Sequence, residues 1–226
     1  MIWVYGICDH PEIPPPRRRG LAQAPLDGLR EGGLLAVFTR HAHSVGDPAP
    51  DALWAHERVV ERLMVDRAVL PMRFGSSVDD EDALRRVLIE RQLPLVATLA
   101  KVAGRVELGV RGLELDAVPN GGAPAALAAV TAGAPSGREY LVAKLRHGQQ
   151  ANRLATELHE PLAALSAEVR VQAPRGAEDV LRGAYLVERG VLPRFRATVE
   201  RLQHAHPEVA ILCTGPWPPY TFVRDA

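Results

Sequence analysis

Cysteine is scarce in this chain of 226 residues. Its two cysteines, Cys8 and Cys213, lie near opposite ends, each in an apolar run, and the sequence contains no Cys-x-x-Cys or Cys/His ligand cluster. These features argue against a structural zinc site and favour buried free thiols in a reducing compartment. A chain of this length buries roughly 70% of the surface that its unfolded form exposes, so it needs no disulfide or metal to fold.

Net charge is absent as well. The 27 Lys and Arg residues balance the 27 Asp and Glu residues, which gives a formal net charge of zero. Nucleic-acid-binding domains usually carry a clear basic excess, so the composition argues against nucleic acid as a partner. Little charge repulsion keeps copies of the chain apart, which favours self-association.

Long hydrophobic runs are missing too. No apolar run approaches the roughly 18 residues of a membrane-spanning helix. The first nine residues have neither the basic region nor the small-residue cleavage site of a signal peptide. The sequence therefore predicts no membrane partner and a cytoplasmic location.

Catalytic motifs are absent from the sequence. It contains no Gly-x-Ser-x-Gly elbow, no Ser-x-x-Lys, no Gly-x-Gly-x-x-Gly and no Walker loop. We therefore expect no enzymatic activity and no cofactor. His41 and His43 would place two imidazoles on one side of a strand end, but no third or fourth metal ligand accompanies them, so exposed histidines are the favoured interpretation.

One alternative stays open at this point: an enzyme, or a heme- or small-molecule-binding protein, that uses His41, His43 or His56 on a ferredoxin-like scaffold. A sensor that dimerises through its sheets is a further alternative. An enzyme should have an enclosed polar pocket with converging titratable groups, whereas a binding protein should expose an apolar patch.

Hydrophobic periodicity predicts alternating strands and helices in two groups. The first group comprises strands at 2–8, 34–40, 69–74 and 105–115, and helices at 52–65, from Ser76 to 91 and at 94–102. The Pro- and Arg-rich stretch 11–33 is expected to be an exposed loop with one helical turn at 26–30. The second group comprises a long helix opened by a capping box at Ser136 and Glu139 and expected to break or kink at Pro161, strands at 168–173, 183–188 and 209–214, and a helix at 191–202.

A composition break separates the two groups. Residues 117–137 are mainly Ala, Gly and Pro and include no charged residue, which is typical of a linker. The pattern predicts an α+β protein of two small domains: 1–116 with a modified ferredoxin-like fold, a linker at 117–136, and 137–226 with a ferredoxin-like-derived α+β fold.

The C-terminal segment 213–223 is unusual, with three prolines among large aromatic residues. Three fixed φ angles make it stiff, so it loses little entropy when it docks. We expect Trp217, Tyr220 and Phe222 to fix the tail on a sheet, because aromatic residues mostly serve cores. A preorganised surface for a partner is the alternative.

Four stretches carry a resemblance to the gas vesicle protein L/F family (GvpL/GvpF). They are the opening strand, a Leu-Pro-x-Arg-Phe-Gly motif preceded by His56 and Glu57, a strand glutamate, and the proline-aromatic ending. The motif residues expected to be structural or to contact a partner are Tyr5, Gly6, Leu70, Pro71, Arg73, Phe74, Gly75, Glu107, Thr214, Gly215, Pro216, Trp217, Pro218, Pro219, Tyr220 and Phe222.

The resemblance implies a non-enzymatic, gas-vesicle-associated accessory protein of two domains. Its implied partners are the small hydrophobic shell protein (GvpA) and other assembly factors, and its implied role is to aid nucleation or prevent aggregation. Exposed apolar surface on an unassembled shell subunit is an aggregation hazard that such a protein would cover. We expect an apolar helix or strand edge of the first domain to make this contact, and Arg73 and Glu107 to form a partly buried ion pair.

Overall fold

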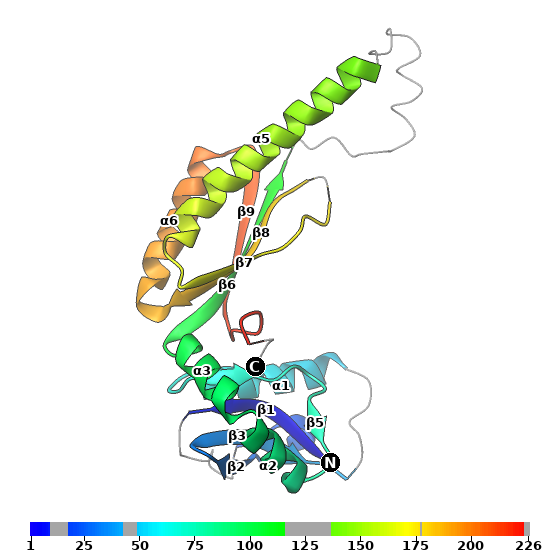
Figure 1. Ribbon diagram of the computed structural model, residues 1–226, viewed down its shortest axis with the longest axis vertical. Helices are drawn as coiled ribbons and strands as arrows, with labels where there is room; N and C mark the ends of the chain where they lie inside the picture. The colour runs from blue at the N-terminus through cyan, green and yellow to red at the C-terminus, as the bar shows by residue number, and fades with distance from the viewer. Residues whose placement is uncertain (10–17, 43–48, 116–136, 177, 224–226) are drawn as a thin grey trace. The chain divides into compact units, whose positions relative to one another are not determined.

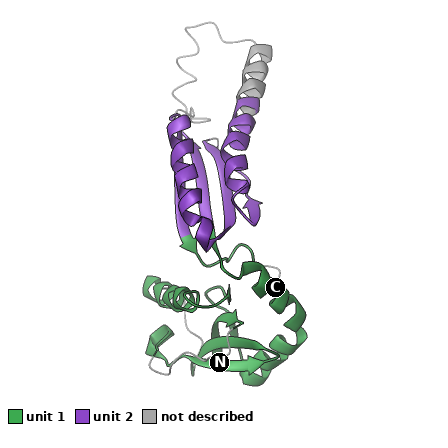
Figure 2. Cartoon of the chain, turned by 90° about the vertical axis from the view of Figure 1, so that its left-hand side faces the viewer, with its two compact units in different colours: residues 1–107, 216–226 green, residues 108–215 purple. Residues whose placement is uncertain are grey.

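The computed structural model describes residues 1–9, 18–42, 49–115, 137–176 and 178–223 (Figure 1). The chain divides into two compact units, residues 1–107 with 216–226, and residues 108–215 (Figure 2). Each unit combines a sheet with helices, so the predicted α+β class is confirmed. No helix in the described part of the chain is both long enough and apolar enough to span a membrane.

The first unit is built on an antiparallel sheet in the order β2-β3-β1-β4, with β5 also pairing with β1. Its strands are β1 (Ile2–Cys8), β2 (Asp27–Glu31), β3 (Leu34–Arg40), β4 (Val69–Pro71) and β5 (Ser77–Val78). All seven residues of β1 are buried, as expected of a central strand whose two faces are both covered.

Helices cover both faces of this sheet: α1 (Pro50–Leu63), α2 (Glu81–Glu90) and α3 (Gln92–Val102). Val4 and Phe38 join Leu88 and Leu99 in one hydrophobic core, which places α2 and α3 on one face. On β1, Trp3 and Tyr5 meet His56 of α1, because alternate residues of a strand point to opposite faces.

The second unit has a four-stranded sheet in the order β7-β8-β6-β9, packed against two helices. Its elements are β6 (Arg105–Glu114), α5 (Gly137–Ala163), β7 (Glu168–Val171), β8 (Asp179–Glu188), α6 (Leu192–Ala205) and β9 (Val209–Trp217). Leu158 and Leu162 of α5 and Phe195 of α6 pack on Tyr185 of β8. Two short 3₁₀ turns, Leu21–Gln23 and Arg189–Val191, complete the described elements of the chain.

Several expected elements differ from those observed. The prediction of a helical turn at 26–30 was wrong: residues 27–31 form β2, which pairs with β3 across a Gly32-Gly33 turn. Both glycines have positive φ (57° and 81°), as two-residue hairpins require. The helix expected from Ser76 begins only at Glu81, because the Asp80 side chain caps it, accepting a hydrogen bond from the Ala83 N–H at 2.8 Å.

Two further differences concern prolines and the expected boundaries. Strand β4 ends at Pro71 instead of continuing to 74, because the chain turns there and the Ser76 N–H donates to the Arg73 carbonyl. The long helix continues past Pro161 to Ala163. The expected linker at 117–136 lies outside the described residues. The compact units also divide the chain elsewhere than the expected domains, because residues 216–226 group with the first unit.

Candidate functional site

Two of the four motif segments, the Leu-Pro-x-Arg-Phe-Gly motif with its preceding His56 and Glu57 and the proline-aromatic ending, meet around one cavity on the first unit. The cavity has a volume of about 490 Å³ and is lined by Pro50, Leu53, Trp54, His56, Glu57, Arg73, Phe74 and Tyr220. These residues come from α1, the turn after β4 and the C-terminal tail. Sequence positions as far apart as 50 and 220 therefore build a single surface.

The rim of this cavity is apolar and open to solvent. Trp54 is 61% exposed and Leu53 is 43% exposed, although both lie on an amphipathic helix whose other face is buried. The wall behind them is aromatic, with Phe74 edge-on to Trp3 at 4.7 Å between ring centroids. Exposed large apolar side chains around a hollow are typical of a surface that binds another molecule.

His56 lies at the base of the cavity and is only 2% exposed. Its Nδ1 accepts a hydrogen bond from the Trp3 indole N–H at 3.0 Å, and its Nε2 lies 2.8 Å from the Met72 carbonyl oxygen. The carbonyl can only accept, so Nε2 carries the proton and the ring is neutral. Both nitrogens are occupied, and burial lowers the pKa of His56 below its ordinary value, a shift only partly offset by the Met72 bond.

The lowered pKa of His56 predicts that the first unit loses stability in mild acid. An unfolded histidine binds a proton near pH 6.5, whereas folded His56 binds one only at lower pH, so below about pH 6.5 the unfolded state holds more protons. The free energy of unfolding should fall by up to about 1.4 kcal/mol per pH unit there and stay level above that pH.

Urea unfolding between pH 5 and 8, followed by tryptophan fluorescence, measures this effect in the first unit, which contains all three tryptophans. H56Q should be less stable at pH 7.5 but should have a flatter pH dependence than the wild type. H41Q is the comparison variant. Burial and the N-terminal amine also lower the pKa of His41, so H41Q measures how much His41 contributes to the same pH dependence. An unchanged slope in H56Q would contradict the assignment.

Glu57 and Tyr220 close one side of the cavity. The Tyr220 hydroxyl donates a hydrogen bond to Glu57 Oε2 at 2.8 Å, joining the tail to α1 across 163 residues of sequence. Burial raises the pKa of Glu57, and the Tyr220 bond opposes that shift. Burial and the neighbouring Glu57 carboxylate both raise the pKa of Tyr220. Tyr220 therefore remains a neutral donor.

Arg73 stands on the turn that follows β4. The Ser76 N–H donates to the Arg73 carbonyl at 3.0 Å, and Gly75 has φ +96°, so the turn needs a residue without a side chain at that position. The Arg73 side chain is exposed on the cavity rim. The turn thus explains the Arg-Phe-Gly order: Arg73 and Phe74 line the cavity, and Gly75 permits the bend.

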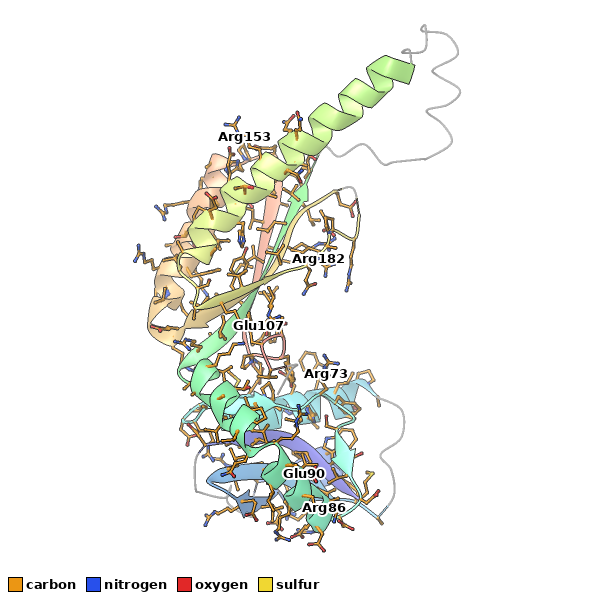
Figure 3. The ribbon with its side chains drawn as sticks, in the orientation of Figure 1. Arg73, Arg86, Glu90, Glu107, Arg153 and Arg182 are labelled. Carbon is orange, nitrogen blue, oxygen red and sulfur yellow. The ribbon has the colours of Figure 1, made fainter. Side chains whose placement is uncertain are left out.

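The expected ion pair between Arg73 and Glu107 was wrong. Glu107 instead holds the tail: Oε2 accepts from the Thr221 N–H at 2.8 Å, and Oε1 accepts from the Thr221 hydroxyl at 2.6 Å. Figure 3 shows Arg73 and Glu107 on separate elements. The glutamate of β6 therefore fixes the C-terminal segment and not the motif after β4.

The tail only partly matches the expectation that Trp217, Tyr220 and Phe222 fix it on a sheet, because the described contacts of Tyr220 and Phe222 are with residues of helices α1 and α3. Phe222 is 3% exposed, Pro218 and Pro219 are buried, and the Lys101 ammonium lies 5.9 Å from the Phe222 ring centroid. Trp217 is the exception, at 40% exposed.

The remaining motif residues lie in strands or at their ends. Leu70 and Pro71 are buried in β4, and Gly6 on β1 pairs with Pro71. The Thr214 hydroxyl donates to the Gly109 carbonyl at 3.4 Å, and Gly215 has φ +107°. Pro216 is exposed near the end of β9. None of these residues lines the cavity on the first unit.

Tyr5 anchors a second, buried network that sequence reasoning did not reveal. Its hydroxyl accepts from the Leu21 N–H at 2.7 Å and lies 3.0 Å from Thr39 Oγ1, which in turn lies 2.8 Å from His41 Nε2. A Cβ at Gly20 would come within 2.3 Å of the Tyr5 hydroxyl, so glycine is required there. The network therefore engages the Nε2 atom of His41. His43 lies outside the described residues.

A larger hollow of about 630 Å³ lies beside His41, but its acidic lining belongs to the start of α2. Within the described ranges, no group of three or more His, Cys, Asp or Glu residues has the geometry to hold a metal ion. Burial raises the pKa of the Cys8 thiol to about 12, which makes it unreactive. The apolar cavity between α1 and the tail is thus the surface that best fits binding of another molecule.

The known proteins that resemble this chain in sequence are named as gas vesicle proteins. A family model described as gas vesicle synthesis protein GvpL/GvpF matches residues 1–224. Gas vesicle protein L of Streptomyces sp. (strain CB03234) is 31% identical, with 94% of this chain and 88% of the relative aligned. Gas vesicle protein F2 of Halobacterium salinarum is 30% identical over 98% of this chain and 91% of the relative.

Solved structures resemble the fold over its full length. The crystal structure of the gas vesicle protein GvpF from Anabaena sp. PCC7120 superposes with a TM-score of 0.79 at 22% identity, covering 99% of this chain and 98% of that one. GvpF from Microcystis aeruginosa gives a TM-score of 0.78 at 19% identity with the same coverage. At these identities the likeness establishes the fold alone.

Proposed function

The chain belongs to the gas vesicle synthesis protein GvpL/GvpF family, and on that premise we propose that it is a non-enzymatic accessory protein of gas vesicle assembly. The resemblance that its motifs suggested is thereby confirmed. The proposed partners are the small hydrophobic shell protein GvpA and other assembly factors. Its proposed place is the cytoplasm, in association with gas vesicles.

The observation that carries this proposal is the open apolar cavity on the first unit. Trp54 and Leu53 expose large apolar surface there, and the polar groups behind them already bind one another, as in the Tyr220–Glu57 and Trp3–His56 hydrogen bonds. A catalytic site needs a titratable group free to meet a substrate, whereas a docking surface needs apolar area and a firm base. The cavity therefore fits the docking of another protein better than it fits catalysis.

The proposed role is to cover an apolar element of the shell subunit before it polymerises. Burying apolar side chains of the subunit against Trp54 and Phe74 would remove aggregation-prone surface from water. Arg73 at the rim would add a polar contact that sets the orientation of the bound element. Among the motif residues, we therefore propose partner contact for Arg73, Phe74 and Tyr220 and structural roles for the others.

We also propose that both units derive from a ferredoxin-like topology. Strands β1, β3 and β4 with α1 and α2 support a modified version in the first unit, and β6 to β9 with α5 and α6 support a derivative in the second. Independent folding of 1–116 and 137–226, joined by a linker at 117–136, remains a prediction.

Co-purification of the full chain with GvpA tests the proposed function. The W54D substitution should weaken capture of GvpA by about tenfold or more, because it places a charge on the apolar rim. Folding should be unaffected, since Trp54 is largely exposed. V65D is the matched control: Val65 is 78% exposed, just beyond the end of α1, and does not line the cavity.

Wild-type capture by V65D together with loss in W54D would support the cavity as the docking surface. Equal capture by both variants would refute the cavity as the contact. Failure of the wild-type chain to retain GvpA at all would refute the proposed partner.

A further inference from the structure

Helix α3 is apolar on two opposite faces. Its inward face packs Leu95, Leu99 and Val102 into the core of the first unit. Its outward residues follow the i, i+3, i+4, i+7 spacing of a helix stripe: Leu93, Val96, Ala97 and Ala100. We call these four residues the α3 outer stripe.

The α3 outer stripe is open to solvent. Leu93 is 83% exposed and Val96 is 47% exposed, and both alanines are exposed. Ile89, near the end of α2, is a further exposed apolar residue, at 54%. A helix that is apolar all round is normally buried, so an uncovered face of this kind indicates a missing partner.

The order of large and small residues along the stripe points to the identity of that partner. The bulky residues Leu93 and Val96 occupy its first half, and the small residues Ala97 and Ala100 occupy its second half. We infer that the α3 outer stripe pairs with the same stripe of a second copy of this chain, with the two helices antiparallel. Leu93 then packs on Ala100 of the other copy, and Val96 packs on Ala97. Each large side chain therefore faces a small one along the whole contact.

Helix dipoles and net charge favour the same arrangement. Antiparallel helices bring opposite dipole ends together, and the zero net charge of the chain adds no long-range repulsion.

The area of the stripe sets the strength expected of the dimer. Stable interfaces bury roughly 800 Å² on each partner, and one face of an 11-residue helix offers less than that. The dimer should therefore be reversible and populated at concentrations on the order of tens of micromolar. This inference is independent of shell binding, because it uses a different surface from the cavity between α1 and the tail.

Sedimentation velocity of the full chain across a concentration series tests the pairing. The wild type should shift from monomer toward dimer as concentration rises, and L93E should raise the dissociation constant about tenfold or more. V65E is the matched control, since it replaces an equally exposed apolar residue away from the stripe and should dimerise as the wild type does. A wild type that stays monomeric throughout, or an L93E variant that dimerises normally, would overturn the inference.

Cysteine cross-linking then tests the orientation. With a short bismaleimide, A97C should cross-link to itself, because Ala97 lies next to the two-fold axis of the antiparallel pair. A100C should cross-link only when mixed with L93C. The unmodified chain, which retains Cys8 and Cys213, provides the background. Self-cross-linking of A100C as efficient as that of A97C would indicate parallel helices and would refute the arrangement.

Discussion

Replacing Phe222 with alanine should lower the free energy of unfolding of the first unit by about 3–5 kcal/mol. Phe222 is 3% exposed, and Val223 beside it packs against the core of the same unit. The substitution removes a buried ring and leaves a cavity beneath the tail. Urea unfolding followed by tryptophan fluorescence measures the loss, because every tryptophan belongs to this unit.

Trp217 offers the control within the same tail. Its side chain is 40% exposed, so W217A should cost about 1 kcal/mol or less. E107Q is a second, independent variant: a neutral amide weakens the two bonds from Thr221 without opening a cavity, and it should cost about 1–2 kcal/mol. Equal losses in W217A and F222A would show that the tail is not anchored through Phe222.

Replacing Gly6 with valine should destabilise the first unit by about 3 kcal/mol, the upper end of the range for overpacked cores. The direction is opposite to that expected from β-propensity, which favours valine in a strand. A Cβ at Gly6 would lie 2.8 Å from Val69 Cγ1 and 3.1 Å from the Leu70 carbonyl oxygen. The carbonyl belongs to the backbone of a paired strand, so it cannot move aside without breaking the β1–β4 register.

Gly190, in the second unit, tests the addition of a Cβ to a glycine where space is available. Nothing lies within 4 Å of a Cβ built there, so G190A should change the free energy of unfolding by less than about 0.5 kcal/mol. If G6V unfolds at the same urea concentration as the wild type, β4 does not press on β1 as the structure describes.

F222A and G6V should also affect the proposed binding surface. Gly6 allows β4 to approach β1, and β4 positions the turn that carries Arg73 and Phe74. Phe222 and Glu107 hold the tail that carries Tyr220 to Glu57. Losses in stability from either variant should therefore be accompanied by weaker capture of the shell subunit, even though neither residue lines the cavity.

Hydrophobic periodicity was sufficient to place most of the elements. Strands β1, β3 and β6 and helices α1, α3 and α6 fall where the sequence predicts them, within a few residues, because each buries a regularly spaced set of its own side chains. The errors occurred where that signal is short. Strand β2 is defined by a glycine turn and β5 by only two residues, and neither carries enough apolar pattern to be seen.

The sequence by itself determined the α+β class, the order of most elements and the motifs that identify the family. The tertiary structure alone decided that His56, Arg73 and Tyr220 share one cavity, that Glu107 binds Thr221 and not Arg73, and that α3 leaves an apolar face uncovered. The reason is physical. Local periodicity fixes which side of an element is buried, whereas contacts between residues more than a hundred positions apart depend on how the folded elements pack.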